Sequence, residues 1–182
     1  MVSTKSSWRG SSGCIRYHPR AGREGRLTAE QAKDKLETPP PSLQATEKYP
    51  KAAVICSCMT EFLRTSDLHK KTGGVHSAAL YSTNGKRIVF FNEIGRHNAV
   101  DKLIGYAVRK PLSLAEAMIL STGRLSSEIL SKAIAAKTPV VVSEASPTSL
   151  AVVMAWESGI VMIGNVRGRK FRVYSGREYV KE

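Results

Sequence analysis

The chain of 182 residues is long enough to form one domain with a sizeable hydrophobic core. Its formal net charge of +13 indicates attraction to a polyanion, to a phosphate-bearing ligand or to an acidic protein. Three cysteines cannot all form disulfides with one another, which favours a reducing compartment. No apolar run reaches the length of a membrane span, and the start lacks the apolar core of a signal peptide. We therefore expect a cytoplasmic protein with no membrane association.

The first part of the chain differs in composition from the rest. Residues 1–50 are rich in Ser, Gly, Pro, Arg and Lys and contain no sustained apolar run. This composition predicts a flexible basic arm or linker, with room for a short helix over 28–36. An ordered domain is expected over 51–182.

From residue 52 onward, the apolar residues alternate between helical and strand-like spacing. The pattern predicts, in chain order, a helix over 54–70, strands over 78–82 and 87–91, a helix over 98–108, a strand over 117–121, a helix over 126–136, a strand over 140–143, a helix over 148–158, and strands over 161–163 and 172–174. Such alternation favours an α/β fold, in which helices on both faces cover a layered, mixed and mostly parallel sheet.

The segment over 92–105 is the most informative, because polar and charged residues surround a glycine where a strand turns into a helix. Open α/β sheets bind ligands at the carboxyl ends of their strands. We therefore expect Arg96, His97 and Asp101 to line one cleft together with His76. The simpler interpretation is a capped helix start with solvated charges, in which Arg96 and Asp101 pair across the first turn.

Two further strand-to-helix corners carry hydroxyl groups. One contains Thr122, Gly123 and Arg124, followed by Ser126 as the expected N-cap. The other contains Ser146, which precedes a proline at the expected first helical position. Unpaired N–H groups at helix starts attract anions, and hydroxyls and an arginine strengthen such sites. Ordinary capping explains each corner alone, but several corners at one sheet edge favour a phosphate-bearing ligand.

Two glycine-containing turns add further candidates. His76 follows two adjacent glycines at the start of a strand, where it can face either a ligand or a hydrogen-bonded interior. Near the C-terminus, Arg167, Arg169 and Lys170 surround Gly168 between two short strands. The alternatives for this tip are a solvated hairpin and a grip on phosphate or on a guanine edge.

The three cysteines lie in different settings. Cys56 and Cys58 fall in a predicted helix, where a buried structural thiol is the default. Their spacing is too tight for the usual zinc site, so no metal is expected. Cys14 lies in the arm beside two arginines and a histidine, and cationic neighbours favour the reactive thiolate. Cys14 is therefore the candidate nucleophile, and an idle residue on the arm is the alternative.

Five ordered motifs between about residue 62 and the end resemble the FdhD family, the formate dehydrogenase accessory sulfurtransferases. The motifs are Thr72-Gly73-Gly74-Val75-His76, Gly95-Arg96-His97-Asn98-Ala99-Val100-Asp101-Lys102, Ser121-Thr122-Gly123-Arg124, Ser146-Pro147-Thr148 with Leu150-Ala151-Val152, and Gly164, Arg167 and Val173-Tyr174. The resemblance implies a cytidine-deaminase-like fold. Deamination itself is disfavoured, because Ala78 stands where the zinc signature of deaminases has a glutamate.

The resemblance also implies a function. In the family, a loop cysteine accepts sulfur as a persulfide from a cysteine desulfurase. The sulfur passes to the molybdenum or tungsten of a bis-pterin guanine dinucleotide cofactor, which then goes to formate dehydrogenase. Cys14 matches the first cysteine of that loop, and Tyr17 stands where a second one often lies. The family's cofactor-binding loop corresponds here to Asn165, Val166, Arg167, Gly168, Arg169 and Lys170.

From this resemblance we expect a homodimeric sulfur carrier that lacks the N-terminal part of usual family members. Two other classes stay open. A non-catalytic cofactor chaperone would keep the C-terminal motifs and make no use of Cys14. A basic nucleic-acid-binding domain would explain the charge but not the five ordered motifs, and aromatic residues are not interleaved with its cations.

Overall fold

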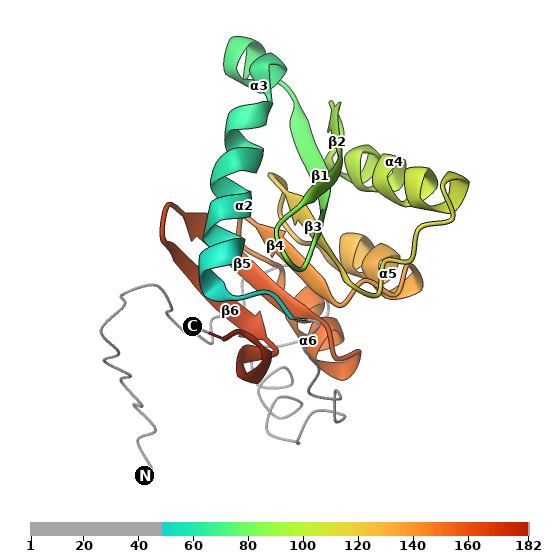
Figure 1. Cartoon of the computed structure of the whole chain (residues 1–182), viewed down its shortest axis with the longest axis vertical. Helices are drawn as coiled ribbons and strands as arrows, with labels where there is room; N and C mark the ends of the chain where they lie inside the picture. Colours follow the sequence, from blue (N-terminus) through green and yellow to red (C-terminus); the bar gives the residue numbers. More distant parts are fainter. Residues whose placement is uncertain (1–48, 182) are drawn as a thin grey trace.

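The structure is a computed structural model that describes residues 49–181, so almost all of the predicted arm, including the possible helix over 28–36, lies outside the described residues. The elements, labelled as in Figure 1, are α2 (Ala52–Thr65), α3 (Asp67–Thr72), β1 (His76–Ser82), β2 (Arg87–Glu93), α4 (Arg96–Arg109), β3 (Ala117–Ser121), α5 (Ser127–Ala135), β4 (Val140–Ser143), α6 (Ser149–Glu157), β5 (Val161–Arg167), β6 (Lys170–Ser175) and the short 3-10 helix η1 (Arg177–Tyr179).

A six-stranded sheet in the order β2-β1-β3-β4-β5-β6 forms the centre of the molecule. The pairs β3–β4 and β4–β5 are parallel, whereas β1–β2, β1–β3 and β5–β6 are antiparallel. The mixed α/β class is confirmed, but the expectation of a mostly parallel sheet is wrong. Apolar periodicity identifies strands without fixing their direction, and the short β1–β2 and β5–β6 connections permit only hairpins.

Alternation along the strands divides the core into two layers. On β1, Ala79 and Tyr81 contribute to one layer, and Ala78 and Leu80 contribute to the other. The first layer includes Phe62 and other residues of α2, and the second includes residues of α4, α5 and α6 (Figure 1). Because β3 and β4 are buried on both sides, their sequences are almost uninterrupted apolar runs.

The helix predicted over 54–70 is in fact two helices, since the chain breaks at Ser66. The Ser66 hydroxyl oxygen accepts a hydrogen bond from the backbone N–H of His69 at 3.0 Å and so caps α3. The same hydroxyl donates to Asn92 Oδ1 at 2.8 Å, and the Ser77 hydroxyl donates to that oxygen at 2.7 Å. These tertiary bonds tie α3 to the β1–β2 hairpin, and a periodic pattern cannot reveal them.

Two predicted helix caps also differ in the structure. Thr148, rather than Ser146, caps α6, because its hydroxyl accepts a hydrogen bond from Ala151 N at 3.4 Å. Ser146 instead donates to Asn165 Oδ1 at 2.8 Å. Ser126 stands at the cap position of α5, but its buried Oγ has no hydrogen-bond partner among residues 49–181. Tertiary partners therefore decide which hydroxyl caps a helix.

The packing of the described chain includes residues close to both of its ends. The rings of Tyr49 and Tyr179 lie 4.7 Å apart, and the Ala52 N–H donates to the Lys181 carbonyl at 2.8 Å, so the two ends of the described chain lie together. None of the helices in this described part has both the length and the apolar character that a membrane span requires.

Candidate functional site

Polar residues from several strands meet at one edge of the sheet. The strands β3, β4 and β5 run parallel, so their carboxyl ends share this edge, and the register sets Ser121 beside Ser143. The antiparallel strand β1 starts at the same edge, where the Thr122 N–H donates to the Ser77 carbonyl at 3.1 Å. We call this the carboxyl edge: the ends of β2, β3, β4 and β5 together with the starts of β1 and β6. It unites the predicted corners after β3 and β4 with the start of β1.

His76 is anchored at this edge by Thr122. Its Nδ1 lies 3.2 Å from Thr122 Oγ1, and that oxygen also accepts the Ser77 N–H at 3.0 Å. Burial lowers the pKa of His76, and the charges of Arg96 and His69 lower it further. The His76 ring therefore favours its neutral form, which can both donate and accept a hydrogen bond.

Arg96 begins α4, and its side chain lies across Gly123. A Cβ atom on Gly123 would lie 2.6 Å from Arg96 Cβ and 2.9 Å from its Cδ, so only glycine leaves room for the arginine stem. Arg96 Nε is buried, and no residue of the described part accepts a hydrogen bond from it or forms an ion pair with this side chain. A partly buried cation without a counter-charge is suited to an anionic ligand.

Two buried serines hold the backbone of the edge in place. The Ser121 hydroxyl oxygen accepts the Gly123 N–H at 3.0 Å, and the Ser143 hydroxyl donates to the Gly123 carbonyl at 2.7 Å. Ser143 Oγ also accepts the Ala145 N–H at 3.0 Å. The corners after β3 and β4 are thus fixed to each other, and Gly123 is fixed beneath Arg96.

The predicted basic tip is the hairpin turn between β5 and β6. Gly168 has a φ of +59°, a left-handed conformation that glycine adopts without strain. Arg167, Arg169 and Lys170 are all exposed at this tip. The β5–β6 hairpin and the β1–β2 hairpin form the two opposite ends of the strand order (Figure 1). The tip therefore supplies exposed positive charge at the β5–β6 end of the carboxyl edge.

Within the same loop, Asn165 and Val166 have different surroundings. Asn165 Nδ2 donates to Tyr174 Oη at 2.6 Å, while its Oδ1 accepts the Ser146 hydroxyl at 2.8 Å. Asn165 therefore joins the corner after β4 to the hairpin. Val166 is 1% exposed and belongs to the hydrophobic core, because alternate residues of β5 point to opposite faces. Its side chain cannot contact a ligand, which corrects its place among the candidate binding residues.

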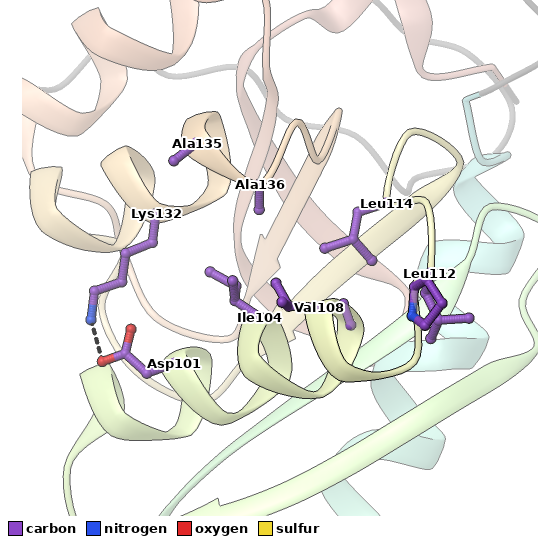
Figure 2. Close-up of a pocket in the computed structure, with 10 residues that line it drawn as sticks. Asp101, Ile104, Val108, Leu112, Leu114, Lys132, Ala135 and Ala136 are labelled. Carbon is purple, nitrogen blue, oxygen red and sulfur yellow. Dashed lines mark hydrogen bonds and ion pairs between the residues drawn. The ribbon is translucent and has the colours of Figure 1, made fainter.

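Asp101 and His97 point to α5. Asp101 Oδ2 and Lys132 Nζ are 2.6 Å apart, and both residues line a hollow of about 460 Å³ between α4, α5 and the loop before β3 (Figure 2). His97 Nε2 lies 3.2 Å from Glu128 Oε2. Because Asp101 follows Arg96 by five helical positions, its side chain is rotated by about 140° from that of Arg96. Asp101 therefore does not line a cleft with His76, and it does not pair with Arg96; both predictions for Asp101 are wrong.

The structure brings two residues to the edge to which sequence reasoning gave no role, His69 and Glu144. Burial raises the pKa of Glu144, and the charges of His69 and Arg167 partly oppose this effect. His69 Nδ1 lies 2.8 Å from the Val75 carbonyl. The sequence signal was weak: one residue lies in a helix before a glycine turn, and the other follows a strand within a corner that was noted for its hydroxyls.

The cysteines of the described chain are buried. Cys56 and Cys58 belong to the buried face of α2 and lie in the hydrophobic core, and burial raises the pKa of Cys58 to about 11. Neither is suited to act as a thiolate nucleophile. Cys14 lies outside the described residues, so its assignment stays a prediction. Within residues 49–181, no three His, Cys, Asp or Glu side chains gather as a metal site requires, and the expectation of no metal likewise stays a prediction.

The described residues form a mixed α/β domain whose carboxyl edge carries a cationic tip and Arg96, which has no partner among residues 49–181, and such an edge is suited to an anionic ligand. The sequence profile of the FdhD/NarQ family matches residues 8–181 of this chain. The chain therefore belongs to the FdhD/NarQ family. The match begins well before residue 62, where the motifs placed the start of the resemblance, and it includes the segment around Cys14.

Relatives and a solved structure agree with this assignment. A protein of Sulfurisphaera tokodaii named sulfur carrier protein FdhD is 40% identical over 128 residues, which are 70% of this chain and 50% of the relative. A protein of the same name from Anaeromyxobacter dehalogenans is 35% identical over 161 residues, 85% of this chain and 54% of the relative. The chain thus spans about half the length of these curated relatives.

The fold is also similar to a crystal structure from Desulfotalea psychrophila, provisionally assigned as a formate dehydrogenase accessory protein. The TM-score is 0.68 and the sequence identity 31%, over 81% of this chain and 62% of the other. At this identity and coverage, the similarity extends from the fold to the family.

Proposed function

We propose that this chain is an accessory sulfur carrier for formate dehydrogenase, a sulfurtransferase that works through a cysteine persulfide. The names of its relatives and the description of the solved structure support this proposal. The sulfur donor is a cysteine desulfurase, and the acceptor is the molybdenum or tungsten of a bis-pterin guanine dinucleotide cofactor. The reaction takes place in the cytoplasm, in a homodimer with a cytidine-deaminase-like fold.

The first sulfur step assigned to Cys14 needs no oxidant or reductant. The Cys14 thiolate attacks the outer sulfur of the desulfurase persulfide, and the S–S bond of the donor breaks as the new bond forms. The desulfurase thiolate is the leaving group. Cys14 then carries the sulfur as a persulfide to the cargo at the carboxyl edge.

The binding part of the proposal depends above all on one observation: the Arg96 guanidinium over Gly123 has no partner among residues 49–181. Arg96 binds a cargo phosphate, while neutral His76 and the Thr122 hydroxyl offer hydrogen bonds beside it. Asn165 fixes the start of the basic tip, which adds further cations. The residues proposed for the cargo are His76, Arg96, Thr122, Gly123, Arg124, Ser146, Asn165, Arg167, Gly168, Arg169 and Lys170.

A non-catalytic cofactor chaperone is the second candidate function. It is favoured by one observation: the carboxyl edge is built entirely from residues 49–181 and does not need Cys14. Both functions require the cargo to bind, and they differ in whether sulfur becomes attached to the chain.

Native mass spectrometry tests the cargo. The full chain, purified from a host that makes the molybdenum cofactor, is expected to carry a bound species that releases a guanine nucleotide on denaturation. Copurified nucleic acid in place of this species would contradict the proposal and favour the nucleic-acid-binding alternative. The same spectra show whether an extra sulfur is attached to the chain, and this mass separates carrier from chaperone.

Replacing Arg96 with alanine is expected to weaken the binding of GDP. Loss of one charge-assisted hydrogen bond costs about 1.5–3 kcal/mol, which is a loss of affinity of about 10- to 150-fold. Isothermal titration with GDP measures the change. Arg109→Ala is the matched control, because it removes an exposed arginine from the last turn of the same helix. Equal losses of GDP affinity in the two variants would mean that Arg96 acts only through the net charge of the chain, and not through a direct contact.

A further inference from the structure

Glu144 occupies the middle of the carboxyl edge. It directly follows β4, and its backbone N–H donates to the Ser121 carbonyl at 3.4 Å. The next residue, Ala145, accepts the Asn165 N–H at 3.2 Å. Glu144 therefore lies between the corner that holds Gly123 and Arg96 and the hairpin that carries Arg167.

The Glu144 carboxylate is half-buried and lacks a partner in the part of the chain that the structure describes. No hydrogen bond or ion pair joins its side chain to any residue within 49–181. Burial raises its pKa, while His69 and Arg167 act on it only through their charges. A carboxylate that is partly withdrawn from water without gaining hydrogen bonds is destabilised in its charged form, and such groups are enriched where a ligand supplies the missing donors.

The chemistry of a carboxylate limits which part of the cargo it can contact. Ionised Glu144 only accepts hydrogen bonds, and it repels phosphate. Its two oxygens match a ligand edge with two parallel N–H donors, as an arginine fork does. Guanine presents such an edge, a ring N–H beside an exocyclic amino group, and the pterin ring presents the same amino-lactam pattern. Adenine and hypoxanthine do not.

We propose that Glu144 accepts two hydrogen bonds from the amino-lactam edge of a guanine or pterin ring and so selects the cargo. This role rests on the proposed function, since it needs the cargo at the carboxyl edge. Different residues of the carboxyl edge then bind different parts of the cargo: Arg96 and the basic tip bind phosphate, and Glu144 binds the ring. A site built to bond a particular N–H strongly rejects an analogue that lacks it.

The test compares ligand pairs that differ at the amino position, which carries hydrogen in IDP and a carbonyl oxygen in the lumazine. Isothermal titration of the full chain measures GDP against IDP, 6-hydroxymethylpterin against 6-hydroxymethyl-lumazine, and inorganic pyrophosphate alone. The variants are Glu144→Gln, which cannot accept both hydrogen bonds, and the control Glu116→Gln. Glu116 is an exposed glutamate just before β3, at the opposite edge of the sheet. A thermal melt of each variant establishes folding.

The expected result is a preference of about tenfold or more for the amino-bearing ligand in the parent and in Glu116→Gln, which is lost in Glu144→Gln. Pyrophosphate binding should survive in all three. A preference confined to the GDP pair identifies guanine as the source, and one confined to the pterin pair identifies pterin.

Two other results have separate meanings. If GDP binds but the preference is absent from the parent, or persists in Glu144→Gln, the role of Glu144 is overturned and the proposed function still stands. If the parent binds neither GDP, nor pterin, nor pyrophosphate, the proposed function fails and the role of Glu144 fails with it.

Discussion

Replacing Cys14 with serine is expected to abolish sulfur uptake from a cysteine desulfurase. A hydroxyl cannot form a persulfide, and the other two cysteines lie on the buried face of α2 in the core. Burial raises the pKa of Cys58 to about 11, which leaves little thiolate near neutral pH. The measurement incubates the chain with a desulfurase and isotopically labelled cysteine and locates the label by peptide mass spectrometry.

The control for this experiment is Cys56→Ala, which removes a buried thiol and should leave uptake unchanged. Label on Cys14 in the parent and in the control, with none in Cys14→Ser, supports the sulfur carrier. Label on Cys56 or Cys58, or on no cysteine, would contradict the assignment of Cys14. An unlabelled chain that still binds the guanine nucleotide cargo would favour the chaperone.

Gly123→Ala should both destabilise the fold and weaken GDP binding. The new Cβ would lie 2.6 Å from Arg96 Cβ, too close to tolerate, so the start of α4 must shift. Overpacking of this kind costs about 1–3 kcal/mol in the free energy of unfolding. Because Arg96 is displaced, GDP affinity should fall together with stability. Urea denaturation and isothermal titration measure the two effects.

Gly105→Ala, a substitution within α4 itself, supplies the opposite expectation. A Cβ atom at Gly105 meets no atom within 4 Å, and alanine favours the interior of α4. Its free energy of unfolding should rise by about 0.5–1 kcal/mol, with GDP binding unchanged. If Gly123→Ala is tolerated as well as Gly105→Ala, Gly123 does not position Arg96.

The sequence by itself determined where most elements lie. Strands over 117–121 and 140–143 were predicted with the bounds that the structure shows, and the helix over 98–108 differs from α4 by two residues at its start and one at its end. The two strands are buried on both faces, and the helix is buried along one regular stripe. The spacing of apolar residues along the chain is therefore enough to identify each element. The motifs also identified the family, and the family match to the chain agrees.

Only the tertiary structure decided the direction of pairing and the membership of the site. Local periodicity could not show that β1 pairs antiparallel to β3, and that pairing is what brings His76 to Thr122. At the helix break, Ser66 forms a hydrogen bond with Asn92 of β2, and Ser146 forms one with Asn165 of β5. Both partners lie far away in the sequence.

The same limit explains the errors at single residues. Helical rotation turned Asp101 toward Lys132, strand alternation buried Val166, and Glu144 after β4 is half-buried without a side-chain partner among residues 49–181. Such features depend on contacts between residues far apart in the chain. A hydrophobic pattern records whether a position is buried but not which distant group lies opposite it, and the chemistry of a site depends on that group.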